Sequence, residues 1–224
     1  MKKKIILLLT FLSIFTFTAC ENSNSDALKF KEEYEKINGE KNSMDLEHRT
    51  LSIDSDNPFV YITPNEIIKK IENKETFYLY FGSEYCPWCR SVIEQAIASA
   101  KKNDIKKIYY FNIWDGDHNE IFRDTYSLNE ENELEKVKDG TDEYYKILEL
   151  LDNVLSEYTL KDSDNNVVKV NEKRIFAPTY IYIEKGESIK MTTGISKNQK
   201  DSRAELTDEV IKDEQDDFDN FFKN

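Results

Sequence analysis

The apolar and polar positions of this chain become regular from Pro58 onward, where short apolar runs alternate with amphipathic stretches. Residues 59–62, 76–81 and 108–113 are nearly continuous in apolar side chains, which is typical of strands that are covered on both faces. The segments between them space their apolar residues as helices do. The order therefore predicts a β-α-β-α-β unit with a parallel core and right-handed crossovers.

Local signals mark where the two helices of this unit begin. Thr63 has the position of an N-cap, Pro64 follows at the first helical position, and Glu66 completes a capping box. The second helix is predicted over 86–102, directly after the central strand. The junction between strand and helix near residue 86 is therefore the carboxyl end of a buried strand.

The second half of the chain predicts an insertion followed by a hairpin and a last helix. Apolar residues at helical spacing predict a strong amphipathic helix over 141–158, so the segment 114–160 is interpreted as a helical insertion. A short strand is predicted over 167–170. Two strands over 179–192 meet at a turn and form a hairpin. The final helix is predicted over 203–222.

The N-terminus has the pattern of an exported protein. Residues 1–19 combine a charged start with an apolar stretch and small residues before Cys20, so they are interpreted as a signal peptide. The segment that ends in a small residue followed by Cys20 resembles a bacterial lipobox, which predicts lipidation of this cysteine. The alternatives are an ordinary signal peptide and a retained membrane helix. Residues 20–56 are predicted to be a polar tether with a short helix over 28–37, and residues 57–224 to be the folded domain.

The charge of the chain limits its partners. The formal net charge is −13 at pH 7. A strongly acidic surface excludes nucleic acid as a partner and excludes electrostatic binding to anionic lipid. Attachment to a membrane would therefore come from the lipid on Cys20, and the simplest role of the acidity is to keep the protein soluble.

A dithiol lies at the junction of the central strand with its helix. Cys86, Pro87, Trp88 and Cys89 form a Cys-x-x-Cys motif at the predicted helix start. The unsatisfied N–H groups and positive end of a helix stabilise a thiolate there, and two intervening residues let the sulfurs bond to each other. The motif predicts thiol–disulfide exchange, with Cys86 as the nucleophile and Cys89 as the resolving thiol.

Two other interpretations of the motif remain, half of a zinc site and a stable structural disulfide. The chain has no second Cys-x-x-Cys, and His48 and His118 are isolated in polar stretches. Asp115, Asp117, His118 and Glu120 lack the length and terminal Glu of a calcium loop, so they are interpreted as a solvated turn. No metal site is expected.

The motif and the elements around it resemble a known family. Residues 80–90, which contain the dithiol, and residues 177–179, Ala-Pro-Thr before the hairpin, are similar to the two diagnostic segments of the thioredoxin fold. The resemblance covers residues 57–223. More narrowly, the chain resembles thioredoxin-like lipoproteins of Gram-positive bacteria, including those labelled bacteriocin transport accessory proteins. The expected fold class is thus α/β, a thioredoxin fold in which a central mixed sheet is flanked by helices, with the helical insertion between the third strand and the hairpin.

The resemblance also implies roles for particular residues. Pro178 would be cis and would pack beside the dithiol, which leaves the backbone of Ala177 free to pair with an extended substrate. The first sulfur, that of Cys86, would be exposed and that of Cys89 shielded. Trp88 is either a contact surface for a substrate peptide or a simple packing residue. The redox-active Cys86–Cys89 disulfide would be the only redox group, with no separate cofactor.

The chain departs from the family pattern in the strand before the dithiol. Many thioredoxins bury an acidic residue beneath the dithiol, and Tyr80 occupies the matching position here. Another group would then have to take up and release protons during thiol–disulfide exchange, and the candidates are Glu84 and water. Tyr85 and Pro87 flank Cys86 and are expected to support the site.

These observations predict an extracytoplasmic, lipid-anchored thiol–disulfide oxidoreductase at the cell membrane. Its partners would be protein thiols and disulfides, a membrane electron-transfer partner and, through Cys20, the membrane itself, with no nucleic acid. The alternative is a non-catalytic thioredoxin-like accessory lipoprotein that binds a secreted partner such as a bacteriocin.

Overall fold

The structure is a computed structural model that describes residues 21–114, 120 and 122–223. The predicted signal peptide and lipidated Cys20 lie outside the described residues, as do Asp115, Asp117 and His118 of the acidic turn. None of the helices that the structure describes is long and apolar enough to cross a membrane.

A five-stranded mixed sheet forms the centre of the molecule, with the strand order β1-β3-β2-β8-β9. The first three strands, β1 (Phe59–Tyr61), β2 (Phe77–Gly82) and β3 (Ile108–Asn112), are parallel, as predicted. The hairpin strand β8 (Thr179–Glu184) runs antiparallel to β2, and β9 (Glu187–Thr192) runs antiparallel to β8 at the edge of the sheet. The fold is therefore mixed α/β, and β2 is its central strand.

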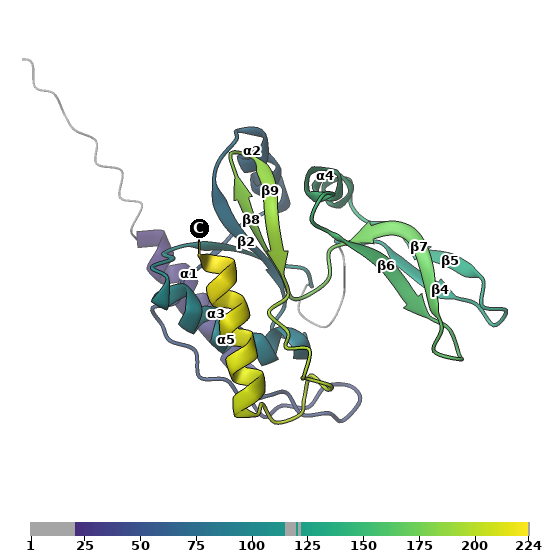
Figure 1. The fold of residues 1–224 in the computed structure, drawn as a ribbon, viewed down its shortest axis with the longest axis horizontal. Helices are drawn as coiled ribbons and strands as arrows, with labels where there is room; N and C mark the ends of the chain where they lie inside the picture. The colour runs from purple at the N-terminus through teal and green to yellow at the C-terminus, as the bar shows by residue number, and fades with distance from the viewer. Residues whose placement is uncertain (1–20, 115–119, 121, 224) are drawn as a thin grey trace, which may run out of the picture.

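Five helices cover both faces of this sheet (Figure 1). The helices α1 (Glu21–Lys36), α3 (Pro87–Lys102) and α5 (Asp208–Phe222) share one hydrophobic core with one face. The helices α2 (Pro64–Glu72) and α4 (Asp142–Leu151) share a second core with the other face. The predicted capping box at the start of α2 is present.

The apolar run of β2 follows from its position between these two cores. Alternate side chains of a strand point to opposite faces. Tyr78 and Tyr80 accordingly lie in the core beneath α1, α3 and α5, whereas Leu79 and Phe81 lie in the core beneath α2 and α4. All six residues of the strand are buried, so neither face requires polar side chains.

The prediction of a polar tether over 20–56 is wrong for the part that the structure describes. The helix α1 extends over the predicted short helix and packs on the sheet, with Phe30 and Tyr34 fully buried. The ring of Phe30 stacks on Phe59 of β1 at 4.2 Å between centroids. Helical spacing places Phe30, Tyr34 and Ile37 on one face, and that face completes the core.

The prediction of a helical insertion over 114–160 is correct only for α4. The segment also contains the hairpin of β4 (Thr125–Leu128) with β5 (Leu134–Lys138) and the strand β6 (Ser156–Lys161). The partner of β6 is β7 (Val167–Arg174), which follows the segment and contains the strand predicted over 167–170. These hairpins project away from the body of the molecule beyond α4 (Figure 1). The insertion is therefore a mixed α/β unit.

The predicted helix over 141–158 begins where expected, at the N-cap Thr141, but it ends at Leu151. Asn153 leaves the helix and donates a hydrogen bond from its side chain to the Ser188 carbonyl at 2.5 Å. Tyr158 lies in the strand β6 that follows. The last helix is likewise shorter than predicted and begins after the N-cap Thr207.

Candidate functional site

The dithiol lies at the carboxyl end of β2, where the chain turns into α3. Cys86 is the N-cap of α3, and Pro87 is its first residue, as the local signals predicted. The Cys86 sulfur accepts a hydrogen bond from the backbone N–H of Cys89 at 3.3 Å. The thiol thus occupies the place of a capping side chain, at the positive end of a 16-residue helix.

The two thiols have different environments and different acidities. The expectation that Cys86 is exposed is wrong, because Cys86 is buried and only 5% exposed; Cys89 is completely buried, as expected, and both are free cysteines. The pKa of Cys86 is lowered from its ordinary value, chiefly by a hydrogen bond with the Cys89 side chain and further by the backbone N–H groups of Cys89 and Trp88. Burial raises the pKa of Cys89. Cys86 is therefore the thiol that ionises first.

The segment before β8 lies directly against this thiol. The Ala177–Pro178 peptide bond is cis, as expected. The Cys86 thiol donates a hydrogen bond to the Ala177 carbonyl at 3.4 Å across 91 residues of sequence. The fold therefore brings together the two segments, 86–89 and 177–178, that the sequence analysis singled out.

The other predicted supporting residues lie around the dithiol. Trp88 is half-buried, and its carbonyl accepts a hydrogen bond from the Ser91 hydroxyl at 2.9 Å. Tyr85 is half-buried, and its ring centroid lies 6.2 Å from that of His48 in an edge-on arrangement. Both readings of Trp88, as a substrate contact and as a packing residue, fit a half-buried side chain.

The position beneath the dithiol is filled by tyrosines. Tyr80 is completely buried, and its hydroxyl lowers the pKa of the neighbouring Cys89 thiol. A second buried hydroxyl, that of Tyr34 in α1, lies 3.1 Å from the Tyr80 hydroxyl. Glu84, the carboxylate proposed from sequence, instead accepts hydrogen bonds from Asn112 at 2.7 Å and from Ser83 at 3.3 Å.

Sequence reasoning missed Arg90, which follows the second cysteine. It is the largest fully buried side chain of the described residues. Its guanidinium donates hydrogen bonds to the carbonyl oxygens of Tyr34, Glu84 and Arg49 and to the Asn38 side chain. Arg90 thus ties α1 and the loop before the dithiol to α3. The motif contains no signal for this role, because all four acceptors lie outside α3.

Sequence reasoning also missed Arg123, which lies in the insertion. Its positive charge contributes to the lowered pKa of Cys86. Its guanidinium donates a hydrogen bond to the Ile175 carbonyl at 2.7 Å, two residues before Ala177, and pairs with Glu120. The insertion therefore acts on the site in two ways, through this charge and through the chain that leads into the cis peptide.

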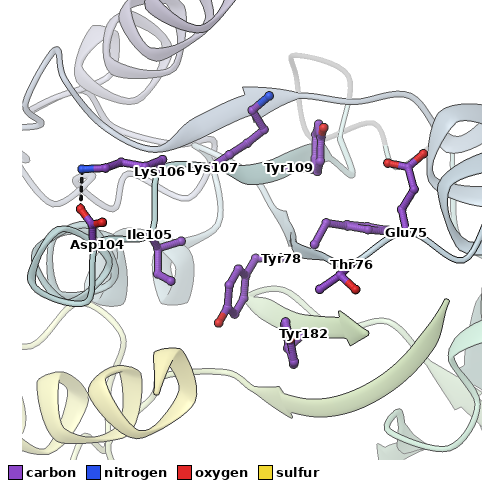
Figure 2. Close-up of a pocket in the computed structure, with 10 residues that line it drawn as sticks. Glu75, Thr76, Tyr78, Asp104, Ile105, Lys106, Lys107, Tyr109 and Tyr182 are labelled. Atoms are coloured by element: carbon purple, nitrogen blue, oxygen red, sulfur yellow. Dashed lines mark ion pairs between the residues drawn. The ribbon is translucent and has the colours of Figure 1, made fainter. Parts of the chain in front are cut away.

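An open pocket of about 450 Å³ lies at the other end of the central sheet (Figure 2). Thr76 and Tyr78 line it where β2 begins, together with Tyr109 and Tyr182 from the neighbouring strands. Because the dithiol follows the opposite end of β2, this pocket is not part of the candidate site. It contains none of the residues predicted from sequence.

Within residues 21–114, 120 and 122–223, no three His, Cys, Asp or Glu side chains converge into a group that could hold a metal ion.

No protein-family model matches the chain, and no curated protein matches its sequence.

Proposed function

We propose that this protein is a thiol–disulfide oxidoreductase with a thioredoxin fold, anchored by lipid on Cys20 at the extracytoplasmic face of the cell membrane. The strand order β1-β3-β2-β8-β9, with helices on both faces, supports the fold assignment. The signal-like N-terminus supports the location. Protein thiols and disulfides are the substrates, and a membrane electron-transfer partner regenerates the dithiol.

The observation that carries the proposal is the position of the Cys86 sulfur. It lies at the end of a helix, 3.3 Å from one backbone N–H and 3.4 Å from the Ala177 carbonyl. The same thiol has a lowered pKa, whereas that of Cys89 is raised. In such an asymmetric pair, the thiol with the lowered pKa is the nucleophile of the first step, and the other thiol remains protonated until the resolving step.

The proposed reaction follows from this asymmetry. The Cys86 thiolate attacks one sulfur of a substrate disulfide, which forms a mixed disulfide and releases the other substrate sulfur as a thiolate. Cys89 then loses its proton and attacks the Cys86 sulfur. The Cys86–Cys89 disulfide forms, and the second substrate thiolate leaves and takes up a proton. The two electrons that reduce the substrate come from the protein dithiol.

The test is the reduction potential of the full chain carrying Cys20→Ser, measured in glutathione and dithiothreitol buffers with detergent. The proposal expects a reversible two-electron couple between about −270 and −120 mV. A second variant, Cys89→Ser, is expected to retain one glutathione on Cys86 after treatment with oxidised glutathione. The matched variant Cys86→Ser is expected to retain none.

The outcomes separate the two functions that the sequence left open. A dithiol that shows no reversible couple would overturn the oxidoreductase proposal and favour the accessory lipoprotein. Glutathione retained equally on Cys89 in the Cys86→Ser variant would overturn the assignment of Cys86 as nucleophile.

A further inference from the structure

The Tyr80 side chain lies along its own strand toward the dithiol. A methyl group at Gly82 would overlap the hydroxyl and ring of Tyr80, so the absence of a side chain at Gly82 makes room for the phenol. Gly82 is two residues closer to the dithiol than Tyr80, and the hydroxyl is therefore displaced in that direction. The ring is held on both sides by Tyr180, at 4.2 Å between centroids, and by Tyr110, at 5.3 Å.

One hydrogen bond joins this hydroxyl to the Tyr34 hydroxyl at 3.1 Å. The Tyr80 hydroxyl also lowers the pKa of the Cys89 thiol, because it lies beside that side chain. Tyr34, Tyr80 and Cys89 are each completely buried, so water does not solvate these groups at the surface. The helix α1 thus contributes one hydroxyl of a buried, hydrogen-bonded pair that lies beside the resolving thiol.

The chemistry of resolution requires charge to develop at this buried sulfur. Cys89 attacks as a thiolate, and a buried thiolate is costly unless a hydrogen-bond donor faces it. Burial raises the pKa of Tyr80 well above its ordinary value, so the phenol remains protonated. Tyr80 is consequently a donor to the developing thiolate and is not the base that removes its proton.

We propose that Tyr80 stabilises the Cys89 thiolate by donating a hydrogen bond to its sulfur, and that Tyr34 positions the Tyr80 hydroxyl and polarises it. This inference rests on the proposed function. In the resolving step, the sulfur–sulfur bond between Cys86 and the substrate breaks and the Cys86–Cys89 bond forms. The proton of Cys89 passes to solvent, and the departing substrate thiolate takes one up. Tyr80 keeps its own proton throughout.

The experiment measures resolution directly. The full chain carrying Cys20→Ser is prepared with glutathione attached to Cys86 by a disulfide, and the release of glutathione is followed from pH 6 to pH 10. Tyr80→Phe keeps the stacked ring and removes only the oxygen. Its pH profile is expected to move upward by about one to two units, with release about 10- to 100-fold slower at pH 7. At high pH the rate is expected to return toward that of the unsubstituted protein.

The matched control is Tyr110→Phe, which removes a hydroxyl that is buried in the same core without a hydrogen-bond partner. Its pH profile is expected to stay unchanged. Tyr34→Phe is expected to move the profile in the same direction as Tyr80→Phe but less far, because the direct contact with Cys89 remains. A purely structural role for Tyr80 would slow release equally at every pH.

Each result decides the inference. Equal profiles for Tyr80→Phe and Tyr110→Phe would overturn it while leaving the proposed function intact, since the unsubstituted protein would still release glutathione. Failure of the unsubstituted protein to release glutathione at any pH would overturn both. Alkylation of Cys86 in the reduced chain is expected to be unaffected by Tyr80→Phe, which separates a local effect on Cys89 from general damage to the site.

Discussion

Replacement of Arg90 by methionine tests whether the N-terminal helix and the dithiol form one structural unit. The guanidinium caps the carboxyl end of α1 through the Tyr34 carbonyl at 2.7 Å, and it reaches the Glu84 carbonyl in the loop before the dithiol at 3.3 Å. It also donates to the Arg49 carbonyl at 3.0 Å. Methionine fills most of the same volume but provides no donor.

The structure gives the size of the expected effect. Three backbone carbonyls lose a donor, and each buried acceptor left without a partner costs about 1–3 kcal/mol. The substitution also relieves the desolvation of the guanidinium, which lowers the pKa of Arg90 to about 10 from 12.5. That relief offsets about 3 kcal/mol at 1.36 kcal/mol per pKa unit. The free energy of unfolding is therefore expected to fall by about 3 kcal/mol, the middle of a range of about 0–6 kcal/mol.

Urea unfolding followed by circular dichroism measures this change in the chain carrying Cys20→Ser. The control is Lys101→Met on the same helix, which removes an exposed ion pair with Asp54 and is expected to cost less than about 1 kcal/mol. Amide hydrogen exchange should become faster in α1 than in α5 for Arg90→Met. A loss no larger than that of the control, with unchanged exchange in α1, would refute the role assigned to Arg90.

Two further predictions test the buried parts of the fold. Phe30→Ala removes a fully buried ring of α1 and is expected to lower the free energy of unfolding in urea by about 3–5 kcal/mol. Leu28→Ala, at an exposed position of α1, is expected to change it by less than about 0.5 kcal/mol. Equal effects of the two substitutions would show that α1 does not belong to the core. Burial raises the pKa of Glu214 from 4.5 to about 8, and the positive charge of Arg49 opposes this rise only partly. The folded state therefore holds a proton that the unfolded state has lost, so the contribution of Glu214 to stability is complete below pH 4.5 and is lost as the pH rises through 8. Glu214→Gln should abolish this part of the pH dependence and raise the urea midpoint at pH 8. Asp216→Asn, at an exposed position, should do neither. A pH dependence of stability that Glu214→Gln leaves unchanged would contradict the raised pKa of Glu214.

The elements around the dithiol were predictable because their signals are local. The apolar run of β2, the N-cap Thr63 with its capping box, and the thiol at the start of α3 all depend on residues within one or two turns of each other. The hairpin of β8 and β9 likewise has its turn signal in the sequence. The strands β4, β5 and β6 were not predicted; all five residues of β5, for example, are exposed, and an exposed strand has no alternation of polar and apolar positions.

The sequence by itself determined the order of the strands and helices in the central unit, the place of Cys86 and Cys89 at a helix start, and the segment that contains Pro178. Only the tertiary structure decided which groups surround the dithiol. Tyr34 meets Tyr80 across 46 residues, and Arg90 meets the Tyr34 carbonyl across 56. The spacing of apolar residues and the capping residues indicate the type and the ends of a single helix or strand. Contacts between residues so far apart in sequence depend instead on how the helices pack on the sheet. For that reason a segment interpreted as a tether supplies part of the core and a hydroxyl beneath the dithiol.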